Sequence, residues 1–471
     1  MTSLSASHFL IKVDSSEIRH LIDHAQRLLN QKNYSEGREV GLRAYAKIAD
    51  NQALDAENQL LIYSILGDCS IELQDWPDAR KYYEMGMQRA SGSSWQAEFL
   101  NKLGHLYIRI KDFSKANPLL EQSLALRTQL YGDQDTLVAD VLNNLGISYL
   151  YIGDIIKALD YQQQALRIRL ANLKPDDLRI AQSYNNLGQC LDDMGESISA
   201  LKALNEAKER YRRHEGSDRE LADVQVNLGR VYFNADNYVA AGRDFEKALT
   251  IYKRLNDMDG MALCLNNLGN VAIQKNHLVE AGILLREALE SRQQLYGNIH
   301  ADVAETWFNL AYLQQEIEQY DEAIEGFEQC LNALNFDLQT DHRIEQVNSY
   351  PTLLSSLYLL ARVYYAKYLE TGHLQSMEKA LLYLSYADET LDYLRVRYEA
   401  LGSKFNLVSI GHDIYELAID LLNEMQNRSG EERYWHQAFR YSEKSKGLLL
   451  LDGIYRSKAD AFGELPNSKL K

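Results

Sequence analysis

Asparagine recurs at regular intervals along the middle of this chain, always beside the same landmark. Asn144, Asn186, Asn227, Asn267 and Asn309 each directly precede a Leu that is followed by Gly or Ala. A carboxamide carries two N–H donors and one acceptor oxygen. A row of carboxamides at repeat spacing therefore predicts a surface that binds the backbone of an extended peptide, whatever the sequence of that peptide.

The same row has a second explanation. The Asn side chains could instead bond the neighbouring repeat and set the pitch between repeats, and the residues alone leave both interpretations open. Arg109 and Arg230 are expected on the same surface. Because a guanidinium binds carboxylates well, these two residues would hold an acidic residue of the peptide.

The Leu-Gly step that follows the Asn belongs to a lattice of small residues. Gly188 is followed after twelve residues by Ala200, and after seven more by Ala207; eight copies of this pattern occur. Twelve residues allow one helix to end, turn and return antiparallel, and seven residues are about two helical turns, so Ala200 and Ala207 share a face. Small residues at these points would let the two backbones approach closely. The lattice predicts stacked helix-turn-helix repeats.

The lattice also predicts the organisation of the chain. Successive copies are spaced by 37 to 42 residues, which is longer than the basic 34-residue tetratricopeptide unit. We expect an all-α, right-handed α-solenoid of about ten hairpins. The predicted segments are a lead-in (1–14), eight regular repeats (15–334), an irregular connection (335–352), two stretched hairpins (353–458), and a tail or the start of a further domain (459–471).

The position of the anchor Leu predicts which face of each first helix binds. If that Leu lies at the buried centre, a rotation of about 100° per residue places its polar neighbours on the opposite face. We expect this face to line the concave surface of the solenoid. The candidate peptide-binding residues are Asn101, His105, Arg109, Asn143, Asn144, Tyr151, Asn185, Asn186, Gln189, Asn227, Arg230, Asn234, Asn266, Asn267, Asn270, Asn309 and Tyr312.

Composition excludes several other classes of function. A net charge of -17 disfavours general binding to nucleic acid, which needs a basic surface, although a local basic groove stays possible. No apolar run is long enough for a membrane span, and residues 1–7 do not resemble a secretory signal. Cys69, Cys190, Cys264 and Cys330 fall inside the repeats and are predicted to be free core residues, as suits a reducing cytoplasm.

Residues that could carry catalysis or hold a metal are few. His20 and His24 are four residues apart and could form a metal pair, but a third ligand is missing, so a solvated pair is the preferred interpretation. His412, between Gly411 and Asp413, superficially resembles a protease His segment but lies in a helical pattern without a paired Cys segment. We therefore predict no catalytic residue, no metal and no cofactor.

The motif Asn-Asn-Leu-Gly occurs at residues 143–146, 185–188 and 266–269. It resembles the long tetratricopeptide repeats of kinesin light chains and related bacterial proteins, and the resemblance covers Ser15 to Ala333. It implies a scaffold that binds a protein or peptide, and it supports the use of the Asn row in peptide binding.

A narrower resemblance covers the C-terminal part. Residues 438–452 are similar to the last helix before the protease domain of bacterial CHAT proteins, which are caspase-like proteases; residues 403–422 resemble the preceding helix, and 461–466 the entry into that domain. The catalytic His and Cys segments of that family have no counterpart in this sequence. The resemblance implies a sensing or regulatory half of a bacterial protease system, with the protease in cis or in trans. The alternative is a free-standing adaptor without an associated protease.

Overall fold

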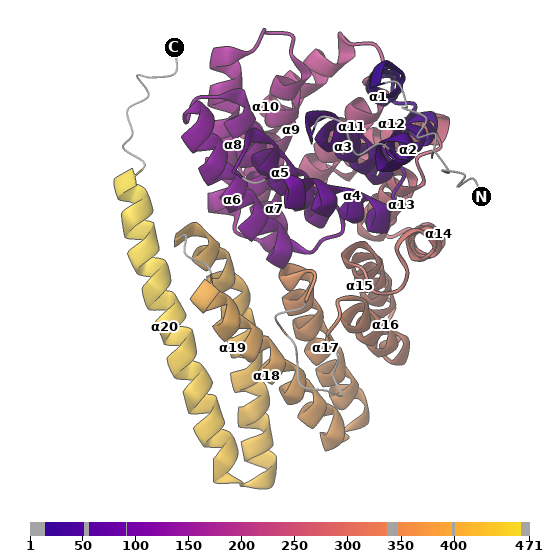
Figure 1. Ribbon diagram of the computed structural model, residues 1–471. Coiled ribbons are helices and arrows are strands. Elements are labelled where there is room, and N and C mark those ends of the chain that lie inside the picture. Colours follow the sequence, from indigo (N-terminus) through magenta and orange to yellow (C-terminus); the bar gives the residue numbers. More distant parts are fainter. Residues whose placement is uncertain are drawn as a thin grey trace, which may run out of the picture. The chain divides into compact units, whose positions relative to one another are not determined.

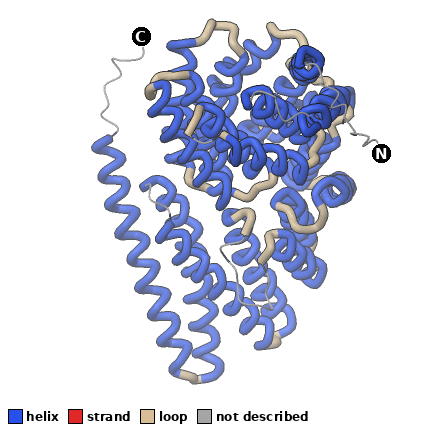
Figure 2. The backbone as a smooth tube through the Cα atoms, in the orientation of Figure 1, coloured by secondary structure: helices blue, strands red, loops and turns tan. Residues whose placement is uncertain are grey.

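The computed structural model describes residues 15–50, 56–90, 92–336, 344, 347–397 and 401–462. Within these ranges the regular structure is helical and no β-strand occurs (Figures 1 and 2). In this described part of the chain, twenty α-helices follow one another in consecutive antiparallel pairs, which confirms the predicted all-α fold of about ten hairpins. The predicted lead-in, residues 1–14, lies outside the described residues.

The chain divides into two compact units, Met1–Leu145 and Gly146–Lys471. The first unit is built from three helical pairs, each helix packing mainly on the other member of its pair and then on the next pair. Its helices are α1 (Ser15–Asn30), α2 (Tyr34–Asp50), α3 (Ala56–Glu72), α4 (Trp76–Arg89), α5 (Ser94–Arg109), α6 (Phe113–Tyr131) and the first part of α7 (Thr136–Ile152).

The second unit begins within α7 and contains the remaining helices. They are α8 (Ile155–Asn172), α9 (Leu178–Asp193), α10 (Ser197–Arg212), α11 (Asp218–Asn234), α12 (Tyr238–Leu255), α13 (Met258–Gln274), α14 (Leu278–Tyr296), α15 (Ala301–Glu316), α16 (Tyr320–Ala333), α17 (Tyr350–Thr371), α18 (Leu374–Arg397), α19 (Leu401–Ser429) and α20 (Glu432–Phe462). Besides the contacts between neighbours, α19 touches α8. The C-terminal hairpin thus contacts the start of its own unit.

The glycines of the Leu-Gly steps have a more specific role than close backbone approach. A Cβ on Gly229 would lie 2.6 Å from the ring of Phe245, a buried residue of the partner helix. Each such glycine leaves room for a side chain sixteen residues later, in the pairs Gly67/Tyr83, Gly104/Leu120, Gly146/Gln162, Gly188/Leu204, Gly229/Phe245 and Gly269/Leu285. In the next copy Ala311 takes the place of the glycine, and a Cβ on Gly326, fifteen residues later, would lie 2.9 Å from the Cβ of Ala311. The small residues of the lattice therefore leave room for side chains that pack between the two helices of a hairpin.

The turns inside the hairpins use one residue in the left-handed conformation. Among the eight regular hairpins, Gly153 and Gly195 supply it in two, and the other six have residues with a side chain: Lys32, Gln74, Lys111, Asp236, Asn276 and Glu318, with φ between 57° and 60°. The left-handed region costs a residue with a Cβ about 1–2 kcal/mol. After the turn, an Asp or Asn side chain commonly caps the second helix, as Asp112 does by accepting from the backbone N–H of Lys115.

Replacing Glu318 by glycine is expected to raise the free energy of unfolding by about 0.5–1 kcal/mol. Relief of the positive φ of 59° outweighs the greater backbone entropy of glycine in the unfolded chain. Chemical denaturation followed by circular dichroism measures the change. Glu322→Gly, inside the first turn of α16, is the matched control and should lower stability. Lower stability of Glu318→Gly would show that this turn carries no strain.

The regular repeats end with α16, and the helices that follow are longer. α17 and α18 contain 22 and 24 residues, and α19 and α20 contain 29 and 31. Part of the predicted connection, residues 337–343, lies outside the described residues. α20 continues to Phe462, four residues past the predicted end of the last hairpin, so the predicted tail begins as helix.

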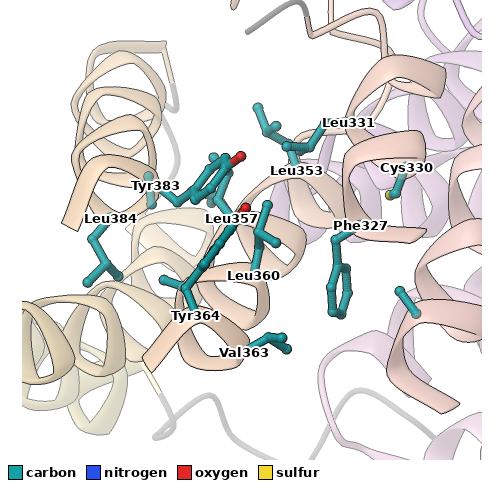
Figure 3. Close-up of a cluster of buried hydrophobic side chains, with 14 of the residues drawn as sticks. Phe327, Cys330, Leu331, Leu353, Leu357, Leu360, Val363, Tyr364, Tyr383 and Leu384 are labelled. Carbon is teal, nitrogen blue, oxygen red and sulfur yellow. The ribbon is translucent and has the colours of Figure 1, made fainter. Parts of the chain in front are cut away.

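One hydrophobic core includes both the last regular repeat and the first of the long hairpins. Phe327, Cys330 and Leu331 of α16 lie in the same buried cluster as residues of α17 and α18 (Figure 3). The residues of α17 and α18 that Figure 3 labels are Leu353, Leu357, Leu360, Val363, Tyr364, Tyr383 and Leu384. The long hairpins are therefore continuous with the packing of the repeats.

Candidate functional site

The predicted binding residues lie on α5, α7, α9, α11, α13 and α15, the first helices of their hairpins. We call this set the amide face. Six of its members are buried: Asn143, Asn185, Asn186, Asn227, Asn266 and Asn309. A buried carboxamide offers a peptide little surface to contact. The amide face therefore contains both buried and accessible side chains, which the sequence pattern does not distinguish.

Three pairs of Asn side chains connect neighbouring hairpins. The amide nitrogen of Asn227 donates to the side-chain oxygen of Asn185 at 2.8 Å. Equivalent bonds run from Asn309 to Asn266 at 3.0 Å and, in the first unit, from Asn144 to Asn101 at 2.9 Å. In each pair the Asn directly before an anchor Leu bonds the residue two positions before the preceding anchor. These six residues join adjacent repeats, as the second of the two interpretations expects.

The register of these bonds fails at one repeat. Asn267 occupies the donor position on α13, but the acceptor position on α11 is filled by Val226. Asn267 and Asn270 are half-buried, and the described residues provide no hydrogen-bond partner for either carboxamide. Two accessible amides thus lie one turn apart on α13. These two carboxamides can therefore bond another molecule.

Arg230 is largely neutralised by carboxylates of the preceding hairpin. Its Nε lies 3.0 Å from Asp192, and one Nη lies 3.4 Å from Asp193. Asn234 also donates to Asp192, at 3.1 Å. The side chain of Asp192 is 1% exposed, so the guanidinium compensates a buried charge. Arg230 consequently has little capacity left for an acidic residue of a peptide. Gln189 and Tyr312 are half-buried and Tyr151 is exposed.

Arg109 in the first unit has a different environment. Its guanidinium lies over the ring of Trp76, 5.6 Å from the centroid. His105, one turn earlier on α5, is half-buried. Burial, followed by the positive charges of Arg109 and Lys102, lowers the pKa of His105 to about 4. Lys102 itself is held by Asp68 at 2.8 Å and Glu98 at 3.4 Å.

The depressed pKa of His105 predicts a pH-dependent stability. Above its ordinary pKa of 6.5 the ring is neutral in both states; as the pH falls from 6.5 towards 4, the unfolded chain binds a proton that the folded chain does not. We expect this residue to cost on the order of 1–2 kcal/mol of stability at pH 4.5. His105→Gln should show a smaller loss than the parent between pH 7.5 and 4.5 in chemical denaturation. His20→Gln, at an exposed position on α1, is the control and should not reduce the loss. Equal losses in all three proteins would contradict the assignment.

Buried arginines form a second set of connections that sequence reasoning missed. Arg292 of α14 is 2% exposed, and its Nη1 lies 2.7 Å from the carbonyl oxygen of Asp302 and 2.7 Å from the hydroxyl of Thr306. Arg169 of α8 makes the same bonds to Arg179 and Ser183. Each arginine thus holds the first helix of the next hairpin.

The position of these arginines could have been found in the sequence. Arg127, Arg169 and Arg292 each stand four residues after the last small residue of the lattice, where the intervening hairpins have Tyr211 and Tyr252. Arg127 donates to the carbonyl oxygen of Leu137 at 2.6 Å. A charged residue that recurs at a buried helical position is the signal of a connection between repeats.

The cysteines and the pair His20 and His24 are the remaining residues that could bind a metal or react. The four cysteines are buried and free, as predicted, and burial raises the pKa of each thiol to about 12. His20 is exposed and His24 half-buried. Among the described residues no three His, Cys, Asp or Glu side chains are grouped so that they could bind a metal ion. In the same part of the chain, none of the helices is sufficiently long and apolar to span a membrane.

Comparison with known proteins identifies the repeats. The family model of the tetratricopeptide repeat matches residues 95–171, 139–213, 220–293 and 278–335. The chain is therefore a tetratricopeptide repeat protein, and its scaffold is of the kind that binds other proteins through extended surfaces. The match ends where the regular lattice ends in the sequence.

Individual relatives cover parts of the chain. Protein KINESIN LIGHT CHAIN-RELATED 2 of Arabidopsis thaliana is 26% identical over 131 residues, which are 27% of this chain and 20% of the relative. The chain thus spans about a fifth of that protein.

Two solved structures are similar to this chain at low identity. BtubC (BKLC) from P. vanneervenii is 22% identical, with a TM-score of 0.37, over 51% of this chain and 92% of that protein. A Rap protein complexed with competence and sporulation factor is 14% identical, with a TM-score of 0.48, over 92% of this chain and 99% of that protein.

Proposed function

We propose that this tetratricopeptide repeat protein is a non-catalytic scaffold that binds an extended segment of a partner protein along those helices of the amide face that belong to the second unit. The observation that carries the proposal is the pair Asn267 and Asn270, whose half-exposed carboxamides have no partner among the described residues. Carboxamides can donate to and accept from a peptide backbone. The segment would be held through its backbone at α13, and neighbouring side chains of the face would add specificity.

The paired members of the amide face have a supporting role in this proposal. The bonds from Asn227 to Asn185 and from Asn309 to Asn266 fix the orientation of α9 to α11 and of α13 to α15. They hold the helices on either side of Asn267 in place. Because the hairpins between α9 and α16 pack mainly on their neighbours, a small rotation on binding would add up along them. Such a rotation would change the contact between α19 and α8.

The test separates the two kinds of Asn. A partner is first isolated from the native host by pull-down and identified by mass spectrometry, and its binding is then measured by titration calorimetry. The double variant Asn267→Ala/Asn270→Ala should weaken binding roughly tenfold or more, about 1.4 kcal/mol, with little change in the melting temperature. Asn227→Ala/Asn309→Ala should instead lower the melting temperature, because the buried side-chain oxygens of Asn185 and Asn266 lose their donors.

Two results would count against this assignment. The first is undiminished partner binding by Asn267→Ala/Asn270→Ala. The second is an equal loss of stability in both double variants, which would mean that all of these amides are structural.

We further propose that the scaffold is the sensing or regulatory half of a bacterial CHAT-type protease system. The support is the resemblance of residues 438–452 to the helix that precedes the protease domain in that family. These residues lie on α20, and Lys444 attaches this helix to α18 through Asp388 at 2.5 Å and Asp392 at 2.7 Å. A change in the repeats would therefore reach α20 through these contacts.

This finer proposal is tested by what accompanies the chain. Affinity purification from the native host should recover a protein with caspase-like His and Cys segments, or a longer product of the same gene that contains them. Recovery of a stable partner with neither would favour the alternative, a free-standing adaptor. Peptide hydrolysis by the isolated chain that persists through stringent purification would overturn the non-catalytic assignment.

A further inference from the structure

Three consecutive hairpins of the second unit expose an apolar side chain at the same position. Ile198 is 87% exposed, Val239 is 74% exposed and Val279 is 80% exposed. Each is the second residue of the second helix of its hairpin, on α10, α12 and α14. Single exposed apolar residues are common on protein surfaces. A repeated position in neighbouring hairpins is different, since it forms a row, and we call it the apolar row.

The fold does not require apolar residues at this position. The other regular hairpins have Ser35, Pro77, Ser114, Ile156 and Asp321 there, and Ile156 is half-buried. The first turn of a helix favours acidic residues and others that satisfy its free N–H groups. Ile and Val gain neither capping nor burial at these exposures. The fold of the second unit therefore gives no reason for the apolar residues at these three positions.

Cations lie beside the apolar row. Lys202 and Arg243 follow Ile198 and Val239 by four residues, one turn further along the same helix face, and both are exposed. Within the described part of the chain no carboxylate lies within 4.0 Å of either cation. In the third hairpin the equivalent position is Ile283, which is 57% exposed. In a chain of net charge -17, two unpaired cations along an apolar row are a local departure from the overall charge.

The acidic groups beside the row lie mainly on its turn side. Asp236 accepts a hydrogen bond from the hydroxyl of Tyr238 at 2.8 Å, and Glu280 lies 3.3 Å from His277. Glu196 is exposed beside Ile198. Lys202 and Arg243 thus lie on the helix side of the row, where Glu246 of α12 is also exposed, and the turn side carries carboxylates.

We propose that the apolar row is a docking surface for an amphipathic helix that carries acidic residues along one margin. The row offers contacts for the apolar stripe of such a helix, and Lys202 and Arg243 would pair with its acidic margin. A helix is the expected form because the surface consists of helices and has no strand edge with which an extended segment could pair. This surface is separate from the amide face, so the two can bind different segments.

The test uses a synthetic peptide as the probe. The peptide is a fluorescently labelled helix of Leu and Glu with one Leu stripe, and its matched control has Lys in place of every Glu. Binding to the full chain is followed by fluorescence anisotropy. We expect the acidic peptide to bind roughly tenfold or more tightly than the basic one, about 1.4 kcal/mol, and to bind more weakly as salt is raised.

Variants of the chain locate the binding. The triple variant Ile198→Ser/Val239→Ser/Val279→Ser should lose roughly tenfold or more in affinity for the acidic peptide. Ile299→Ser/Leu369→Ser, at exposed apolar positions of the same unit, is the control and should bind as the parent does. All five positions are exposed, so circular dichroism should show unchanged folding. Equal affinity of the triple variant and the parent, equal binding of the two peptides, or no binding up to about 0.1 mM peptide would each overturn the proposal.

Discussion

Replacing Arg292 by methionine is expected to lower the free energy of unfolding by about 2–3 kcal/mol. The guanidinium is 2% exposed and binds the carbonyl oxygen of Asp302 and the hydroxyl of Thr306 across two helices. Its removal leaves the buried Thr306 hydroxyl without this donor, and the Asp302 carbonyl keeps only the bond from Thr306; such a loss costs about 1–3 kcal/mol. The ion pair with Glu305 adds little, because the Glu305 side chain is 42% exposed and regains water.

Chemical denaturation measures this loss, and hydrogen exchange locates it. We expect faster exchange at the first turns of α15, which Arg292 holds. Arg286→Met changes an exposed arginine of the same helix and should alter stability by less than about 0.5 kcal/mol. Equal effects of the two substitutions would show that Arg292 does not connect the hairpins.

Replacing Gly229 by alanine is expected to destabilise the second unit by about 1–3 kcal/mol. The new Cβ would lie 2.6 Å from the ring of Phe245, which is 1% exposed and has no room to move away. Overpacking a filled core by one methyl group forces a shift of side chain or backbone. The better helix propensity of alanine offsets only about 1 kcal/mol of that cost.

A second glycine of the same hairpin is the matched control. A Cβ on Gly242 of α12 would meet only Val271, at 3.6 Å, which is an ordinary contact. Gly242→Ala should therefore raise stability by about 0.5–1 kcal/mol through helix propensity. Thermal melts of the two variants should move in opposite directions. Stabilisation by both would mean that the Leu-Gly step has no packing role.

The small-residue lattice predicts the helical pairs because every hairpin requires small residues at the points where its two helices pack together. Small residues at the positions of Gly188 and Ala200 recur at a fixed spacing, because the two helices of each hairpin pack against each other in the same way. The partner of each glycine was not predicted, because the residue that fills its space is Tyr, Leu, Gln or Phe in different hairpins. A position that different residue types occupy in different repeats produces no periodic pattern in the sequence.

The amide face could be predicted only as a set of positions. Helical geometry places Asn227 and Asn267 at equivalent points, yet one is bonded and the other is accessible. The difference depends on the preceding hairpin, which has Asn185 in one case and Val226 in the other. Arg230 was expected to bind a peptide, and its neutralisation depends on Asp192 and Asp193 of another helix. Contacts between repeats, unlike contacts within one helix, do not follow from a single helical wheel.

The central claim is that the accessible amides of α13 meet a partner protein. It is tested most directly by photo-cross-linking in the native host, with a photoreactive amino acid in place of Asn270. Asn205, an exposed residue of α10, carries the same group in the control protein. We predict that the probe at residue 270 gives a discrete cross-linked species that the probe at residue 205 does not. No cross-link at residue 270, or the same products from both positions, would contradict the claim.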